Sequence, residues 1–382
     1  MGPNIDRGLS HVIILLGVAF AVPRHSEAQQ APRVWDSAGV RIVTHGELAT
    51  VSAPFEIAKV STVDFGGLRK NPDEELDSRN PFLVARPLSD GRWIVVDWAA
   101  LKLFDGRGTF VRTVGRTGSG PGEFRQVRDV CVAPGDTLIA FEFSDRRISV
   151  FDSAGTHLRT ALIEGRAGPN PCLGDGSILV RGEAAPNPRS KLSRQAAALM
   201  DRVAHVERVR WDGVRIGTLG ALQVETLDLT FEEVGNIAAG PEHIYVGNGS
   251  EPEYRVYNSA GKLLQIVRWQ ARRTAVTTAM REAASRRGFA PGAAARDFLP
   301  VYGALVPGPD AVVWVQDYPL PRAKPPGYTV FDRNGFMLGR TEPPPVSSGR
   351  VIVQWIGTNR VALAWRDSDG GAHITVHAVT YP

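Results

Sequence analysis

The sequence predicts an all-β protein assembled from six similar antiparallel sheets of four strands each. One observation behind this prediction is a recurring phrase, in which an aromatic residue is followed by Asp or Asn, two small or polar residues and Gly, at residues 35–39, 104–108, 151–155, 257–261 and 331–335. Asp or Asn near Gly favours a tight hairpin turn, because these residues tolerate positive φ where the chain reverses. A turn that recurs with β-rich sequence between its copies indicates an array of similar sheets.

A second recurring turn divides the chain into units. Gly-Asp, Gly-Pro or a related pair precedes a short run of β-branched or aromatic residues near residues 90, 135, 174, 240, 308 and 357. Each unit is therefore predicted to contain an inner strand before this turn, two middle strands, and an outer strand after the Asp-x-x-Gly turn.

Closure of the array distinguishes a ring from an open stack. The sixth unit has three predicted strands and lacks an outer one, whereas the phrase at residues 35–39 is followed by a strand at residues 40–43 with no sheet before it. Pairing residues 40–43 with the strand around residues 373–379 would close the ring and remove an unpaired edge. We therefore predict a six-bladed β-propeller whose N-terminal strand closes the last blade.

Three further segments interrupt the pattern. Residues 190–206 are rich in Ala, Leu and Arg and contain no Gly or Pro, so they predict a helical insert. Residues 274–287 predict a second short helix with Thr274 as its N-cap. Residues 45–79 are expected to form a short strand followed by an exposed loop.

The N-terminus carries the features of an export signal. Residues 12–22 are apolar, Arg7 precedes them, and Ser26-Glu27-Ala28 forms a small-x-small cleavage pattern. The run is shorter than the roughly 20 apolar residues that span a bilayer. We expect residues 1–28 to be a signal peptide, and residues 29–382 to form one soluble, monomeric propeller domain in a periplasmic or extracellular space.

Composition excludes several classes of protein. The chain of 382 residues is 43% hydrophobic and 22% charged, which is ordinary for a globular protein and excludes disorder. The formal net charge of +4 comes from scattered Arg residues. Because nucleic-acid binding requires a basic stripe with interleaved aromatics, we expect no nucleic-acid partner.

A family resemblance rests on two adjacent motifs. Gly118-Ser-Gly-Pro-Gly-Glu-Phe124 follows an outer strand, and an inner strand and the run Asp145-Arg-Arg-Ile-Ser-Val-Phe-Asp152 come after it. This arrangement resembles NHL-repeat six-bladed β-propellers over about residues 90–160. The whole layout is also similar to exported bacterial six-bladed propellers of undefined function, which begin with a segment like residues 36–43. Such motifs specify architecture rather than activity.

The resemblance implies two enzymatic alternatives. A zinc-dependent amidating lyase would need several His residues in the central channel, and the mature chain has only His45, His157, His205, His243, His373 and His377. A metal-dependent, lactonase-like hydrolase would need acid and amide side chains at inner-strand ends. The candidates for such a site are Asn80, Asp129, Asn170 and Asn236, with Arg79 and Arg128 beside them.

Asp129 and Asn236 fit a channel site best, but the acid and amide set is incomplete. We therefore favour a non-catalytic propeller that recognises a protein, peptide or glycan ligand at the channel mouth, through Arg79, Asn80, Arg128, Asp129 and Asn236. The alternative is the lactonase-like hydrolase. We expect no cofactor for the binding protein, whereas the hydrolase would hold a divalent ion such as calcium in the channel.

The two cysteines, Cys131 and Cys172, fall in the predicted inner strands of units two and three. An oxidising compartment favours a disulfide between such neighbours. Two separate buried thiols are the alternative, because Cys also behaves as a small hydrophobic residue. The sequence leaves both open, since a slip in strand register could move the Cα atoms beyond about 7 Å.

Overall fold

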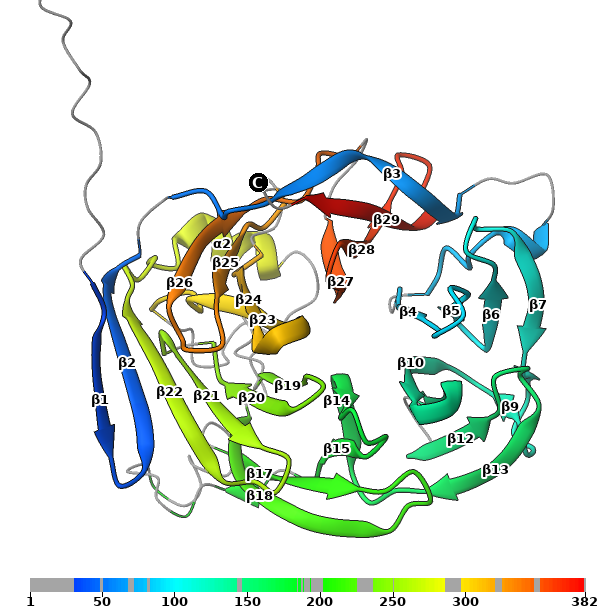
Figure 1. Cartoon of the computed structure of the whole chain (residues 1–382), viewed down its shortest axis with the longest axis horizontal. Helices are drawn as coiled ribbons and strands as arrows, with labels where there is room; N and C mark the ends of the chain where they lie inside the picture. Colours follow the sequence, from blue (N-terminus) through cyan, green and yellow to red (C-terminus); the bar gives the residue numbers. More distant parts are fainter. Residues whose placement is uncertain are drawn as a thin grey trace, which may run out of the picture.

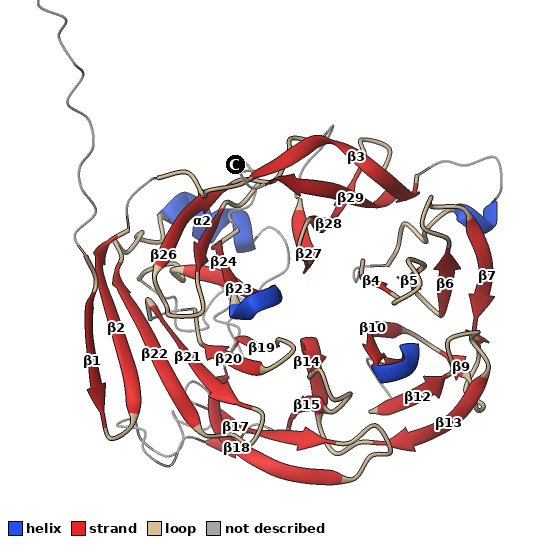
Figure 2. Cartoon of the chain, in the orientation of Figure 1, coloured by secondary structure: helices blue, strands red, loops and turns tan. Residues whose placement is uncertain are grey.

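The protein is a six-bladed β-propeller whose sheets surround a central axis (Figures 1 and 2). The computed structural model describes residues 31–48, 51–67, 72–80, 83–142, 146–183, 185–186, 188, 193, 202–224, 236–249, 251–285, 297–319, 325–346 and 351–380. None of the helices in these ranges combines the length and apolarity needed to span a bilayer. The predicted fold class is confirmed.

Blades one to three follow the predicted order from the axis outward. Blade one contains β4 (Ala85–Pro87), β5 (Trp93–Asp97), β6 (Ala100–Phe104) and β7 (Phe110–Val114). Blade two contains β10 (Val127–Ala133), β11 (Thr137–Glu142), β12 (Arg147–Phe151) and β13 (His157–Leu162). Blade three contains β14 (Arg166–Cys172), β15 (Ile178–Arg181), β17 (Arg202–Val209) and β18 (Arg215–Val224), and β16 (Ala185–Pro186) also pairs with β17.

Blades four to six differ in how they end. Blade four contains β19 (Asn236–Ala239), β20 (His243–Gly247), β21 (Glu253–Asn258) and β22 (Leu263–Gln270), extended by β2 (Val40–Glu47) and β1 (Arg33–Ser37). Blade five contains β23 (Tyr302–Pro307), β24 (Val313–Asp317), β25 (Tyr328–Phe331) and β26 (Met337–Thr341). Blade six contains β27 (Ile352–Ile356), β28 (Arg360–Arg366), β29 (Ala372–Thr380) and β3 (Glu56–Gly66).

The loop between blades one and two contains a small sheet of its own. Here β8 (Arg116–Thr117) and β9 (Glu123–Phe124) form a two-stranded parallel pair. Glu123 accepts a hydrogen bond from the Gly120 N–H at 2.8 Å and pairs with Arg116. The Gly-rich motif at residues 118–124 is therefore a folded inter-blade loop.

All five copies of the recurring phrase fold as hairpin turns, as predicted, and in four of them the acidic or amide side chain holds the turn. Asp105 Oδ1 accepts the N–H groups of Arg107 and Thr109 at 2.9 and 2.8 Å, and Gly108 adopts a φ of +87°. Asp152, Asn258 and Asp332 accept two N–H groups in the same way. Asp367 does so in blade six, where an extra residue separates it from the aromatic Trp365 and hides the phrase in the sequence.

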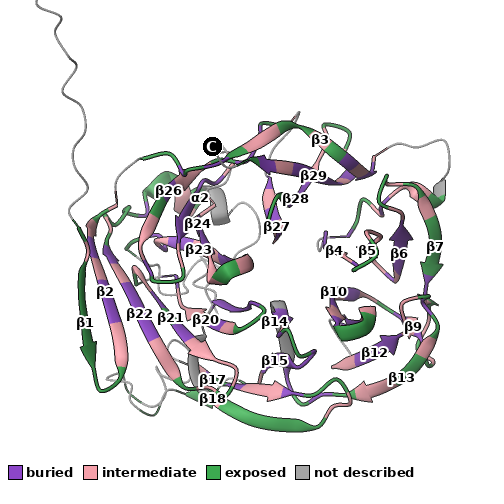
Figure 3. Cartoon of the chain, in the orientation of Figure 1, coloured by how far each residue is buried: buried purple, intermediate pink, exposed green. Residues whose placement is uncertain are grey.

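The hydrophobic core lies between neighbouring blades rather than at one centre. Phe65 of blade six packs against Trp93 and Phe104 of blade one, with ring centroids 5.8 and 5.0 Å apart. Trp314 is buried in the same manner between blades five and six. Figure 3 shows the complementary pattern, since the outer strands β1, β7 and β18 are largely exposed.

An N-terminal strand closes the ring, as predicted, but the prediction that residues 40–43 form this strand is wrong. β3 pairs antiparallel with β29, placing Phe65 opposite Ile374, whereas β2 runs parallel to β22 and extends blade four. Residues 45–79 therefore contain an eleven-residue closing strand rather than mainly a loop. Only its last residues are buried, at Val63, Phe65 and Gly66, so hydrophobic alternation was too brief to reveal it.

The predicted helices meet different outcomes. Residues 202–206 belong to β17, so the predicted helix is wrong there, and residues 190–201 lie outside the described residues apart from Ser193. The second helix is confirmed as α2 (Thr278–Ser285). Its cap is Thr277, whose Oγ1 accepts the Met280 N–H at 3.2 Å, rather than Thr274.

A histidine links the closing strand β3 to the other strands of blade six. His373 of β29 has Nδ1 3.1 Å from Asp64 of β3 and Nε2 3.2 Å from Asp367. Its ring stacks on Trp365 at 4.2 Å. Burial lowers the pKa of His373, but hydrogen bonds to Asp64 and Asp367 and the negative charges of these carboxylates outweigh burial and raise the pKa above the ordinary value.

This histidine should make the stability of the contact between β3 and β29 depend on pH. Because the folded pKa of His373 is raised, its contribution is fully present below the unfolded value, near 6.5, and is lost as pH rises through the folded pKa. The difference in unfolding free energy between wild type and His373→Gln should therefore shrink as pH rises from about 5 to about 9. Urea unfolding across this range measures it, and a difference independent of pH would contradict the charged state.

Candidate functional site

All six blades meet at a cavity on the axis, where the inner strands end and turn outward. Its volume is about 570 Å³, which suits a small molecule or a short segment of a larger ligand. Each blade contributes lining residues, among them Arg86, Val132, Leu173, Pro241, Pro309 and Trp355. We call this space the axial cavity.

The lining of the axial cavity is mainly apolar, with Gly and Pro from the first turns of the blades. Its charged lining side chains, among the described residues, are those of Arg86 and Arg360. Arg360 is exposed and lies 6.0 Å from the ring centroid of Trp93. The turns that follow the inner strands also contain acidic residues. The carboxylate of Asp136, in the turn of blade two, accepts the Ser89 N–H and hydroxyl at 2.9 and 2.7 Å.

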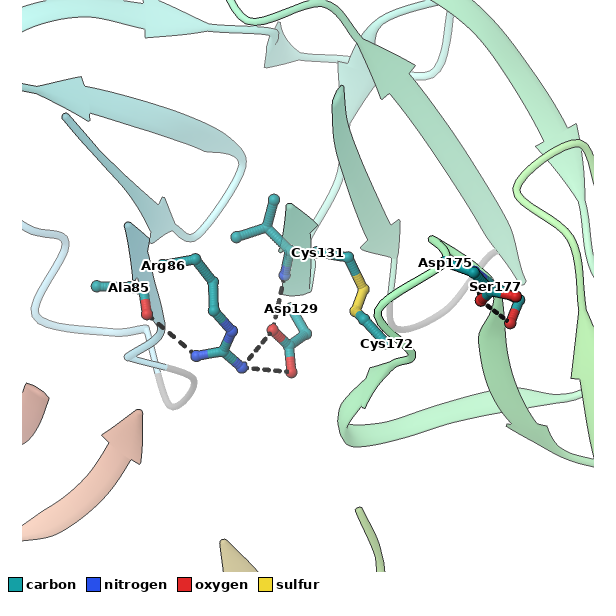
Figure 4. The surroundings of a disulfide bond; sticks show 8 residues. Ala85, Arg86, Asp129, Cys131, Cys172, Asp175 and Ser177 are labelled. Atoms are coloured by element: carbon teal, nitrogen blue, oxygen red, sulfur yellow. Dashed lines mark hydrogen bonds and ion pairs between the residues drawn. A yellow bond between two sulfur atoms is a disulfide. The ribbon is translucent and has the colours of Figure 1, made fainter. Parts of the chain in front are cut away.

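Arg86 connects three blades at the wall of the cavity, and Figure 4 shows its contact with Asp129. From β4 its Nη1 donates to the carbonyl of Gln354 on β27, and its Nη2 lies 3.2 Å from Asp129 Oδ1 on β10. Both side chains are nearly inaccessible, at 11% and 3% exposure. Blades six, one and two are thus joined by one guanidinium group.

Asp129 therefore has a structural partner at the position predicted for ligand binding. Its Oδ1 also accepts the Val130 N–H at 2.7 Å. A buried carboxylate that is neutralised by Arg and bonded to the backbone has little charge to offer a ligand or metal. The sequence did not reveal Arg86, because pairing between residues 43 positions apart depends on blade geometry.

A disulfide continues this chain of links around the axis. Cys131 of β10 and Cys172 of β14 are bonded, with Cα atoms 5.8 Å apart, so blade two is joined to blade three (Figure 4). Both residues line the axial cavity. Of the two alternatives that the sequence left open, the structure contains the disulfide.

Removing this disulfide should destabilise the protein by about 4 kcal/mol in the chain-entropy model, given the sequence separation of 41 between its cysteines. The double variant Cys131→Ser, Cys172→Ser tests this by chemical denaturation. Intact mass of the unreduced, alkylated and denatured wild type is the control. Uptake of two alkyl groups would mean free thiols and would contradict the bond.

Arg79 and Asn80 lie away from the axial cavity. The Asn80 side chain is fully buried and donates from Nδ2 to the carbonyl of Val96 at 3.1 Å, while its own carbonyl accepts Arg366. The Arg79 side chain is 76% exposed and pairs with Asp77 at 2.6 Å. These two predicted residues belong to the junction of blades six and one.

Arg128 and Asn236 stand near the beginnings of inner strands, whereas the axial cavity lies at their ends. Arg128 is half-buried beside Asp129 on β10, and Asn236, the first residue of β19, is 8% exposed. On the same strands, Cys131, Val132 and Ala239 line the cavity. The predicted binding set is therefore divided among three places, and the side chain of Asn170 lies outside the described residues.

Among the described residues, no histidine lines the axial cavity. His45 Nε2 lies 2.8 Å from the Gly335 carbonyl, and His377 Nδ1 lies 2.8 Å from the Ala58 carbonyl. Burial lowers the pKa of both imidazoles. Across the ranges that the structure describes, no three His, Cys, Asp or Glu side chains are grouped so that they could hold a metal ion.

Comparisons with known proteins agree on the fold. Residues 87–162 match a family model described as "6-bladed beta-propeller", which spans blades one and two. A candidate exported protein from Bacteroides fragilis has a TM-score of 0.54 at 12% identity, covering 89% of this chain and 99% of that one. A DUF4221 family member from Bacteroides vulgatus has a TM-score of 0.52 at 9% identity, covering 86% and 99%.

Other comparisons add no functional assignment. A gluconolactonase from Xanthomonas campestris has a TM-score of only 0.42 at 13% identity, covering 91% of this chain and 95% of that one, and this likeness carries no functional argument. No curated protein sequence matches the chain. The comparisons thus support a six-bladed propeller with an exported-protein relative in fold.

Proposed function

We propose that the mature chain, residues 29–382, is an exported, non-catalytic propeller that binds a protein, peptide or glycan ligand in the axial cavity. The observation that carries this proposal is the cavity itself, which collects apolar and turn residues from all six blades around two Arg side chains. A concave, mostly apolar site with a few polar groups is the usual form of a binding site. This assignment moves the expected ligand contacts from Asp129 and Asn236 to Arg360, Trp355 and their neighbours.

Export is supported by two independent features. The apolar run at residues 12–22 and the pattern before residue 29 favour cleavage by signal peptidase. The disulfide between Cys131 and Cys172 favours an oxidising compartment. Intact mass of protein recovered from the periplasm or medium would test this, because cleavage after Ala28 predicts a chain that begins at Gln29.

A metal-dependent hydrolase is the alternative, and the described residues give it little support. Its best ligand, Asp129, is paired with Arg86, and Asn80 is bonded within the blade junction. Metal analysis of the purified mature protein, followed by a panel of lactones and esters, separates the two functions. We expect no stoichiometric divalent ion and no turnover, and metal-dependent turnover that Asp129→Asn abolishes would establish the hydrolase instead.

A further inference from the structure

Blade four ends in β1, which pairs with β2 on one side and with no other strand among the described residues. β2 and β1 extend it to six strands, so β1 projects beyond the ring (Figure 1). All five residues of β1 are exposed, including Val34 at 41% and Trp35 at 43%. By contrast, the edge of β26 is bonded to a neighbouring segment, since Ala53 donates to the Arg340 carbonyl and Arg340 donates to that of Val51.

The hairpin between β1 and β2 fixes which peptide groups face this edge. Ala38 and Gly39 both have positive φ, at +50° and +77°, as in a two-residue type I′ turn, so Ser37 and Val40 form a hydrogen-bonded pair. Hydrogen-bonded and non-hydrogen-bonded pairs alternate along an antiparallel ladder. The peptide groups of Val34 and Asp36 therefore point away from β2 toward the open edge.

We infer that β1 pairs antiparallel with β1 of a second copy of this chain. Residues whose peptide groups face the edge must stand opposite each other, which leaves three two-fold registers within the strand. Asp36 opposite Asp36 would juxtapose two carboxylates, and Val34 opposite Asp36 would set a carboxylate against an apolar side chain. Val34 opposite Val34 avoids both conflicts.

The register centred on Val34 also makes favourable use of the remaining side chains. Arg33 of each copy stands opposite Trp35 of the other, in a non-hydrogen-bonded pair where side chains lie closest. A guanidinium group over an indole ring is attracted by a cation–π interaction. Two such pairs flank the central Val pair, so the sequence Arg33-Val34-Trp35 is complementary to itself.

This pairing departs from the monomer expected from the sequence. The contact through one short strand buries less surface than the interface of a permanent dimer. Monomer and dimer should therefore be in equilibrium, with more dimer at higher protein concentration. A two-fold pair would carry two axial cavities, and two cavities that engage one partner together gain avidity without any new ligand contact.

Sedimentation of residues 29–382 across the micromolar to sub-millimolar range tests the pairing. Wild type should form a dimer as concentration rises. Val34→Lys and Val34→Glu should each weaken association about tenfold or more, because like charges then stand opposite each other. An equimolar mixture of the two variants should recover association, since Lys then meets Glu.

The controls distinguish the Val34-centred register from the other two registers and from a contact elsewhere on the propeller. Val60→Lys places the same charge on β3, where the residue is 81% exposed, and should leave association unchanged. Unchanged melting temperatures of the Val34 variants would show that the hairpin remains folded. The proposal is overturned if the wild type stays monomeric or if the mixture of variants does not recover association. Stronger association of Val34→Lys would also overturn it, because that result is expected when residue 34 stands opposite Asp36.

Discussion

Replacing Phe65 with alanine should lower the free energy of unfolding by about 3 to 5 kcal/mol, the usual cost of deleting a buried aromatic ring. Phe65 is fully buried on β3 and packs against Trp93 and Phe104 of the neighbouring blade. The change therefore removes packing at the one seam where the N-terminal segment completes a blade. Urea denaturation measures the loss.

Val60 provides the matched control on the same strand. It is 81% exposed, so Val60→Ala should change the unfolding free energy by less than about 0.5 kcal/mol. Phe65→Leu should fall between the two, because it keeps most of the buried volume. Equal stability of the Phe65→Ala and Val60→Ala variants would show that β3 does not close the ring.

Replacing Asp129 with alanine should cost about 3 to 5 kcal/mol, because it leaves the buried guanidinium of Arg86 without its counter-charge. The two side chains are 3% and 11% exposed and lie 3.2 Å apart. The sequence analysis placed Asp129 in a ligand-binding set, where its replacement would impair binding without unfolding the protein. The structure predicts a stability defect instead.

A double-mutant cycle tests the pairing directly. Arg86→Met with Asp129→Leu removes both charges and fills much of the volume, so the double variant should be more stable than Asp129→Ala. Arg92→Met with Asp90→Leu is the control, since that pair is more exposed, at 28% and 45%. Independent, additive effects at Arg86 and Asp129 would contradict a coupled buried pair.

Local chemistry explains why the fold was predictable. In four of the five copies of the phrase, the Asp or Asn side chain bonds to N–H groups two and four residues later, so the turn is fixed by a few adjacent residues, as at Asp105. Strands on either side follow from such turns. Blade number and strand order could therefore be predicted without any long-range information.

Closure and the site depend on long-range contacts, so the sequence did not show which strand closes the ring or which residues lie beside the predicted site residues. β2 and β3 are both N-terminal strands at a sheet edge, and β3 is the one whose Val63 and Phe65 pack against the first blade. Asp129 has the residue type of a ligand, and its pairing with Arg86, far away in sequence, gave no local signal. The axial cavity is likewise lined by turn residues such as Pro241 and Thr358, whose chemistry gives no local signal.

Ligand binding at the axial cavity is the central claim, and blocking the cavity tests it most directly. Peptide and glycan arrays should be probed with the mature wild type and with Thr358→Trp, which places a large ring at an exposed lining position. Thr156→Trp, in an exposed turn of blade two away from the cavity, is the control. We expect wild type and Thr156→Trp to bind the same array members and Thr358→Trp to lose them. Equal binding by all three proteins would show that the ligand site lies elsewhere on the propeller.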